Sequence, residues 1–188
     1  MRALTSSRQL GAVVGLVVLL MLIGCSTQYR VDATTRYAEF DGEINQHTRL
    51  IHAPAQRLFA IVTDQDRFQS ILPEGTVLVH ESAPPYQPGA TVRMYINHIF
   101  KLTWQSRIEE VVPPRKIRLT FVDGFFAGGA EIWEFEPADG GTRTTHTIIV
   151  DPHGFWRKVA WNLKVRLKHD KMVEQMLDNL ELVANGQH

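Results

Sequence analysis

Residues 91–121 read TVRMYINHIFKLTWQSRIEEVVPPRKIRLTF. Apolar and polar side chains alternate over residues 92–97, and the alternation resumes over residues 100–108 and 117–121. A period of two is typical of strands that bury one face of a sheet. The connections are short, and Pro113-Pro114 forms one of them, so we expect these strands to pair as antiparallel neighbours.

The pattern changes upstream of this stretch. Residues 47–52 are predicted to form a strand, and Pro54 then suits the first turn of a helix. The apolar residues within 58–62 fall on one helical face, and a second short helix is expected over residues 66–72. A strand over residues 77–81 then leads into the alternating segment.

Downstream, Trp133 and Phe135 indicate a further strand, Gly140-Gly141 predicts a hairpin turn, and residues 142–150 form the last strand. The stretch from 155 to 183 has the length and spacing of a long helix. The order is one strand, two short helices, about six strands and a long helix. This order predicts an α+β domain in which the helix covers the buried face of the sheet.

The N-terminus has the pattern of an export signal. Basic residues precede the uncharged run LGAVVGLVVLLMLIG, residues 10–24, which is shorter than the roughly 20 apolar residues that span a bilayer. The run ends in Leu22-Ile23-Gly24-Cys25, which resembles the lipobox of bacterial lipoproteins. In that family the peptide before the cysteine is cleaved and the cysteine receives the lipid. The alternative interpretation is a transmembrane anchor with a coincidental cysteine.

This resemblance implies a signal peptide over residues 1–24, lipidation at Cys25 and a tether over residues 25–44, followed by a domain over residues 45–185. Acyl chains anchor a protein through burial of about 0.8 kcal/mol per CH₂. Ser26 stands where an aspartate would favour retention at the inner membrane. We therefore expect a cell-envelope protein anchored at the periplasmic face of the outer membrane.

Composition narrows the function classes. Without residues 1–24 the chain keeps 18 Lys and Arg against 20 Asp and Glu, and nothing in this balance suggests nucleic-acid binding. Cys25 is the only cysteine. Once it is lipidated, no thiol remains for a disulfide, for catalysis or for a thiolate metal site.

Four motifs resemble the helix-grip fold of the START, polyketide-cyclase and birch-allergen superfamily. They are IHAPAQRLF at 51–59, Pro88-Gly89, Phe135-Glu136-Pro137, and GGTRT at 140–144. The resemblance spans roughly residues 46–183. It implies a curled antiparallel sheet of about seven strands wrapped on a long C-terminal helix, with two short helices after the first strand. It also implies an apolar cavity of the kind that commonly holds a lipid, sterol, polyketide or other hydrophobic molecule.

Inward-facing aromatic residues are candidates for lining such a cavity. Trp104, Phe121 and Trp133 fall on the apolar side of their strands, where they either line a pocket or fill a core. Phe125 and Phe126 lie in a glycine-rich hairpin, which indicates a gate at the cavity mouth, a contact with lipid, or a tucked-in turn.

Two polar residues are predicted to face the same interior. His146 shares its strand face with Thr144 and Ile148, so it is a candidate ligand contact or a hydrogen-bonded core histidine. Glu131 either faces inward beside Trp133, where burial would raise its pKa towards that of a general base, or lies partly solvated at the strand end.

The sequence shows no pattern for a metal, a cofactor or a nucleophile. His47 and His52 fall on opposite faces of their strand, and His98, His146 and His153 lack ligand-like spacing. Neither a phosphate-binding glycine loop nor a nucleophile elbow is present in the sequence.

The expected C-terminal helix is basic in its first half and carries aromatic residues among the charges. Such charges either form the solvated face of a core-facing helix or attract anionic head groups, at about 1 kcal/mol per basic residue. The basic residues are Arg157, Lys158, Lys164, Arg166, Lys168, His169 and Lys171.

These patterns predict a membrane-tethered carrier or sensor that binds a hydrophobic small molecule or lipid, without a clear catalytic site. A cyclase-, aromatase- or dehydratase-like enzyme is the first alternative, and a structural envelope protein with a filled core is the second. Convergent ionisable groups in a sizeable cavity would favour the enzyme, whereas a filled interior would favour the structural protein. The sequence leaves the oligomeric state open.

Overall fold

The computed structural model describes residues 37–82, 86–97, 101–152 and 154–187. The predicted signal peptide, Cys25 and most of the predicted tether lie outside the described residues. The chain divides into two units, Met1–Phe40 and Asp41–His188. In the first, the described residues form a turn in which the Phe40 N–H donates to the Tyr37 carbonyl at 3.0 Å.

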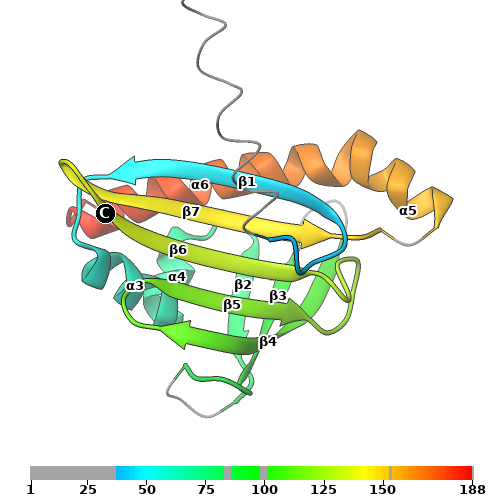
Figure 1. The fold of residues 1–188 in the computed structure, drawn as a ribbon, viewed down its shortest axis with the longest axis horizontal. Coiled ribbons are helices and arrows are strands. Elements are labelled where there is room, and N and C mark those ends of the chain that lie inside the picture. The colour runs from blue at the N-terminus through cyan, green and yellow to red at the C-terminus, as the bar shows by residue number, and fades with distance from the viewer. Residues whose placement is uncertain (1–36, 83–85, 98–100, 153, 188) are drawn as a thin grey trace, which may run out of the picture. The chain divides into compact units, whose positions relative to one another are not determined.

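Seven strands of the described part of the second unit form a single antiparallel sheet, in the order β1-β7-β6-β5-β4-β3-β2 (Figure 1). The first strand therefore pairs with the last, and β1 and β2 lie at opposite edges. The strands are β1 (Glu43–Ile51), β2 (Thr76–His80), β3 (Thr91–Ile96), β4 (Leu102–Val112), β5 (Lys116–Phe121), β6 (Ala130–Ala138) and β7 (Gly141–Val150).

The first strand begins earlier than the sequence pattern indicated. Glu43 already pairs with Val150, and Gln46 pairs with Thr147. Residues 43–46, which the sequence pattern left outside the strand, belong to the sheet because they pair with the last residues of β7.

The two short helices lie within one residue of the positions expected from the sequence. α3 (Ala55–Thr63) follows Pro54, and α4 (Gln65–Ile71) begins after Asp64, whose side chain accepts a hydrogen bond from the Arg67 N–H at 2.9 Å. Such a cap satisfies a backbone donor that the first helical turn leaves unpaired.

The predicted long helix is present but changes its hydrogen-bonding pattern. α5 (Phe155–Ala160) passes through a π-helical turn, η1 (Trp161–Val165), into α6 (Arg166–Ala184). π-Helical turns often occur at functional sites.

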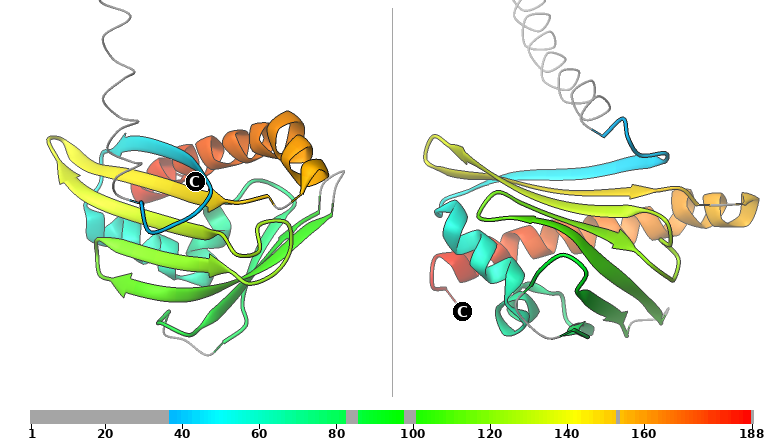
Figure 2. Two further views of the ribbon diagram at one scale, coloured as in Figure 1. Left: turned by 45° about the vertical axis from the view of Figure 1, so that its right-hand side comes forward. Right: turned by 60° about the horizontal axis from the view of Figure 1, so that its bottom comes forward.

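The sheet curls around α6, with α3 and α4 closing the interior between the two sheet edges (Figure 2). The buried residues of α6 recur at helical spacing and include Val173, Leu177 and Leu180. The Asn179 amide donates to the Ile71 carbonyl at 3.0 Å and ties α6 to α4. This arrangement confirms the predicted helix-grip fold.

The glycine-rich hairpin between β5 and β6 packs closely against the sheet. Gly124 has a φ of +77°, which favours glycine, and a Cβ atom on Gly129 would collide with the carbonyl oxygen of Ile149. The backbone therefore comes close enough to β7 to turn Phe126 into the interior.

Among the described residues, no helix combines the length and the apolar character needed to cross a membrane.

Candidate functional site: a carboxylate in an apolar cavity

A small cavity lies between the inner face of the sheet and helices α3 and α4. The volume of this cavity is about 20 Å³, which is enough for about one water molecule. Its walls are mainly apolar and include Phe68, Met94 and Leu119. The polar groups at its surface come from Tyr86, Ser106, Glu131 and the indole of Trp133.

The carboxylate of Glu131 is held by two neighbours on the inner face of the sheet. Its Oε1 accepts hydrogen bonds from Trp133 Nε1 at 2.9 Å and from His146 Nε2 at 3.1 Å. Trp133 and His146 are directly opposite each other on β6 and β7, with ring centroids 4.5 Å apart. Because a carboxylate only accepts hydrogen bonds, Nε2 of His146 must carry a proton.

The pKa of Glu131 is lowered, whereas the sequence led us to expect that burial of an inward-facing Glu131 would raise it. Burial alone raises the pKa of this carboxyl, but the hydrogen bond and charge of His146, together with the Trp133 donor, outweigh that effect and lower it. The side chain is 16% exposed, so it does face the interior as one of the two interpretations held. It is an ionised carboxylate rather than a base with a raised pKa.

Tyr86 presents a hydroxyl to the same cavity. Burial, and then the negative charge of Glu131, raise the pKa of Tyr86 well above its ordinary value. The phenol therefore stays neutral and can donate a hydrogen bond. Its ring packs against His80, with centroids 5.4 Å apart.

Of the three aromatic residues that were candidates for the cavity wall on the strands, two line the cavity and one does not. Trp104 and Trp133 line the cavity as expected. Phe121 is buried beside the cavity rather than in its wall, and its ring contacts Trp104 and Phe126 at centroid distances of 6.4 and 5.3 Å.

The glycine-rich hairpin is a tucked-in turn and not an exposed gate. Phe126 is only 4% exposed and packs edge-on against Trp104 and Trp161, with centroids 5.2 and 6.2 Å apart. Phe125 is partly buried against Phe126. Of the three interpretations of this hairpin, the burial of Phe126 favours the tucked-in turn.

His169 does not belong to the solvated face of the helix, where its basic neighbours lie. It is 7% exposed, and its ring lies 5.8 Å from that of His146. The signal was available, because His169, Val173, Leu177 and Leu180 recur at helical spacing on the buried face. Tyr86 and Ser106 were missed because their loop and strand positions carry no distinctive pattern.

Solved structures share this fold at low sequence identity. A Thermus thermophilus protein, TTHA0849, is 19% identical with a TM-score of 0.65, and the match covers 77% of this chain and 98% of that one. Ms6760 from Mycobacterium smegmatis is 16% identical with a TM-score of 0.61, covering 79% and 99%. Ara h 8.0201 is 12% identical with a TM-score of 0.60, covering 78% and 100%.

No curated protein matches this chain. Residues 51–181, however, match the family model described as polyketide cyclase / dehydrase and lipid transport. This match spans strands β2 to β7, the residues that line the cavity and nearly all of α6, and it begins at the last residue of β1. Because it covers well over half of the sequence, the chain belongs to the polyketide cyclase / dehydrase and lipid transport family.

Proposed function

We propose that this protein binds a hydrophobic molecule or lipid that carries a hydrogen-bond donor, and serves as its carrier or sensor at a membrane. The observation that supports this function is the ionised carboxylate of Glu131 at the surface of an apolar cavity. A charge is costly in apolar surroundings unless it is hydrogen-bonded. A ligand with a hydroxyl or an amine at one end of an apolar body meets that requirement.

The hydrogen bonds of Glu131 support a specific orientation of the ligand. Both donors, Trp133 and His146, reach Oε1. In the described part of the chain no further hydrogen bond reaches Oε2, so that oxygen is available to a ligand. The neutral hydroxyls of Tyr86 and Ser106 lie on the same cavity wall and offer further contacts.

The size of the cavity requires side chains to move during binding. Pockets that hold drug-sized ligands measure about 300–1,000 Å³, against about 20 Å³ here. Tyr86 is only partly buried, in the connection between β2 and β3, and Met94 has a flexible side chain. We expect these two residues to move outward when a ligand enters.

Tryptophan fluorescence tests the proposal, because Trp104 and Trp133 lie in the cavity wall. A lipophilic probe with a terminal hydroxyl should quench the emission of the detergent-solubilised full-length chain. Tyr86→Ala should admit the probe more readily by enlarging the cavity. Exclusion of the probe by both proteins would support a structural protein with a filled core.

An acid–base enzyme is the second candidate function, and the contact between Glu131 and His146 favours it. A carboxylate hydrogen-bonded to an imidazole can orient it for proton transfer to a bound substrate. If the protein is such an enzyme, Glu131→Gln and His146→Gln should abolish turnover of a cyclisable or dehydratable substrate while retaining its binding. A carrier would lose affinity instead and show no turnover.

The membrane attachment belongs to the same proposal. We propose that Cys25 carries the lipid that tethers the domain to the periplasmic face of the outer membrane. α5 supports a second contact with lipid, because it has no buried residue and exposes 71% of Phe155 and 79% of Trp156. Tryptophan is enriched at membrane interfaces, and exposed apolar patches mark interaction sites.

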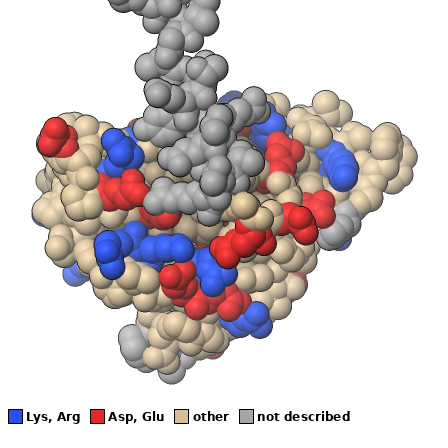
Figure 3. Space-filling view, in the orientation of Figure 1, with Lys and Arg blue, Asp and Glu red and all other residues tan. Residues whose placement is uncertain are grey.

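The charges on α5 also favour contact between this helix and a lipid surface. Arg157 and Lys158 lie beside the exposed aromatic pair on α5 and favour an anionic lipid surface. In Figure 3 the tip that α5 forms is mostly uncharged, whereas acidic and basic side chains are interspersed over the visible face of the sheet.

A further inference from the structure

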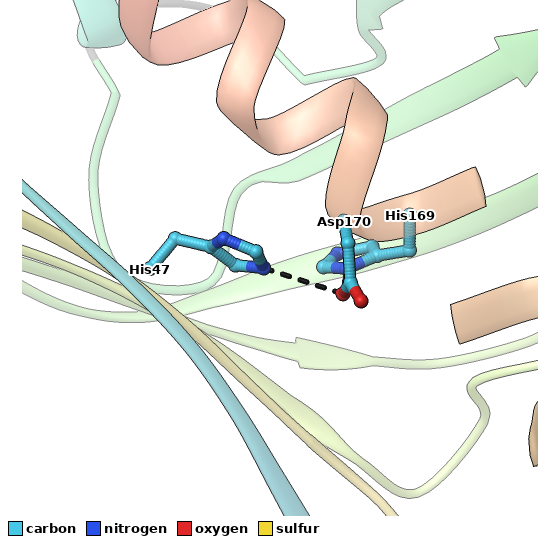
Figure 4. A group of neighbouring side chains, drawn as sticks. All are labelled: His47, His169 and Asp170. Carbon is cyan, nitrogen blue, oxygen red and sulfur yellow. Dashed lines mark hydrogen bonds and ion pairs between the residues drawn. The ribbon is translucent and has the colours of Figure 1, made fainter. Parts of the chain in front are cut away.

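A second polar cluster lies between β1 and α6, and none of its members lines the cavity. It consists of His47 on β1 and the adjacent His169 and Asp170 on α6 (Figure 4). One donor atom from each residue lies within 4.8 Å of the other two. His47 Nε2 is 3.3 Å from Asp170 Oδ1, and His169 Nδ1 is 3.9 Å from the same oxygen.

These distances approach those of a four-coordinate metal site. Zinc binds histidine nitrogen and carboxylate oxygen at about 2.0–2.2 Å, which places tetrahedral ligand atoms about 3.3–3.5 Å apart. The separation of His47 and Asp170 already has this value. The His169 nitrogen must approach Asp170 by about 0.5 Å to complete one further edge, and all three ligand atoms lie within 4.8 Å of one another before any metal binds.

The outer contacts of His47 resemble those of a metal-bound imidazole. Its Nδ1 donates to Glu174 Oε1 at 2.6 Å, so its Nε2 faces Asp170. Metal-binding histidines commonly donate their other N–H to a carboxylate, which fixes the tautomer and the ring orientation. The Asn45 amide likewise donates to Asp170 Oδ1 at 2.8 Å and orients that carboxylate.

His169 supplies independent support for a ligand. Its side chain is 6% exposed, and its Nδ1 is buried without a hydrogen-bond partner among the described residues. Leaving a buried polar atom without a partner is unfavourable, and a bound cation would supply that partner.

Asp170 provides the negative charge. Its Oδ1 is the oxygen that lies 3.3 Å from His47 Nε2 and 3.9 Å from His169 Nδ1. Arg49 neutralises the next acidic residues along the helix, because it pairs with Glu174 and Asp178. Asp170 is 31% exposed at its side chain, so an ion and a completing water can reach it from solvent.

We propose that His47, His169 and Asp170 together bind one divalent transition-metal ion of the zinc class, with water in the remaining position. Two imidazoles and a carboxylate suit Zn²⁺ in preference to Ca²⁺ or Mg²⁺, which take oxygen ligands. The site holds β1 against α6 and is independent of ligand binding in the cavity.

Titration with Zn²⁺ and with Co²⁺ tests this site on the full-length protein in detergent after removal of metals by a chelator. We expect Zn²⁺ to bind and raise the Tm, and Co²⁺ to develop the visible absorption of a four-coordinate ion. His47→Asn and His169→Asn should each weaken binding at least tenfold. Glu174→Gln should weaken it by about 10–100-fold, because it removes the carboxylate that orients His47.

His52→Asn is the matched control. His52, which directly follows β1, also contacts α6, through Glu181 at 3.0 Å, and it is not part of the cluster. Its replacement should leave metal affinity unchanged. Asp170→Asn serves as the ligand variant if a histidine variant fails to fold, and circular dichroism establishes the fold of each.

The proposal is overturned if the wild-type chain fails to bind Zn²⁺. It is also overturned if the ligand variants that fold bind Zn²⁺ as tightly as the wild type. Probe uptake by the cavity should be the same in His47→Asn and in the wild type, so failure of this site leaves the proposed function standing and can be told apart from it.

Discussion

Replacing Glu131 by glutamine removes the charge from the cavity and keeps the size of the side chain. The carboxylate accepts hydrogen bonds from Trp133 at 2.9 Å and from His146 at 3.1 Å. A hydrogen bond to a charged group contributes about 1.5–3 kcal/mol and a neutral one about 0.5–1.5 kcal/mol, so the substitution should cost about 2 kcal/mol at neutral pH. For a chain of this length, the Tm should fall by about 4–8 °C.

The pH dependence of this loss has a definite sign. The folded-state pKa of Glu131 lies below the ordinary value of 4.5, because the hydrogen bond and charge of His146 and the hydrogen bond from Trp133 together outweigh the effect of burial. The stabilisation from the ionised form is complete above the unfolded-state pKa and is lost as the pH falls through the folded-state pKa. The difference in stability between the wild type and Glu131→Gln should therefore shrink as the pH falls below 4.5.

Urea and thermal unfolding, followed by circular dichroism at several pH values, measure this difference. Glu110→Gln is the matched control, because Glu110 forms a partly exposed ion pair with Lys116 at 2.9 Å. It should change the free energy of unfolding by about 0.5 kcal/mol or less. The reasoning is refuted if Glu131→Gln is as stable as the wild type at neutral pH, or if their difference grows on acidification.

Three further predictions concern the core and the membrane. Phe126→Ala should lower the free energy of unfolding by about 3–5 kcal/mol in chemical denaturation, because the ring is buried. Trp156→Ser should change the same free energy by only about 0.5 kcal/mol. Equal losses in the two variants would contradict the placement of the hairpin. Wild-type protein should bind anionic vesicles more weakly as the salt concentration rises. The triple variant Trp156→Ser, Arg157→Glu and Lys158→Glu should bind them more weakly than the wild type. Equal vesicle binding by the triple variant and the wild type would contradict a lipid contact through α5. Cys25→Ala should not incorporate labelled fatty acid, and continued labelling would exclude lipidation at this residue.

The strands were predictable because each one buries a single face. In β3, Val92 and Met94 are buried and flank the less buried Arg93. In β5, Ile117 and Leu119 are buried and flank the less buried Arg118. This alternation is visible in the sequence itself. The helix-grip arrangement followed from the order of the elements and from the family motifs. The π-helical turn at Trp161 carries no comparable signal, because its residues are compatible with an ordinary helix.

The candidate sites were less predictable because tertiary contacts create them. Phe126 is buried against Trp104, a residue of β4, and no local pattern reveals that contact. Glu131 and His146 come together through the pairing of β6 with β7.

The proposed metal site depends on contacts that are even more distant in sequence. His47 and Asp170 are separated by 123 residues and meet only when α6 crosses β1. A sequence search for ligands at regular short spacing therefore passes over them.

Native mass spectrometry of the full-length protein, released from membranes in a mild detergent, tests the central claim most directly. The account predicts that the wild type and Glu110→Gln retain one lipophilic molecule bearing a hydroxyl or an amine, recoverable by solvent extraction, and that Glu131→Gln loses most of it. The account is contradicted if wild-type protein carries no such molecule and does not take one up from added lipid. It is equally contradicted if Glu131→Gln retains the molecule as fully as the wild type.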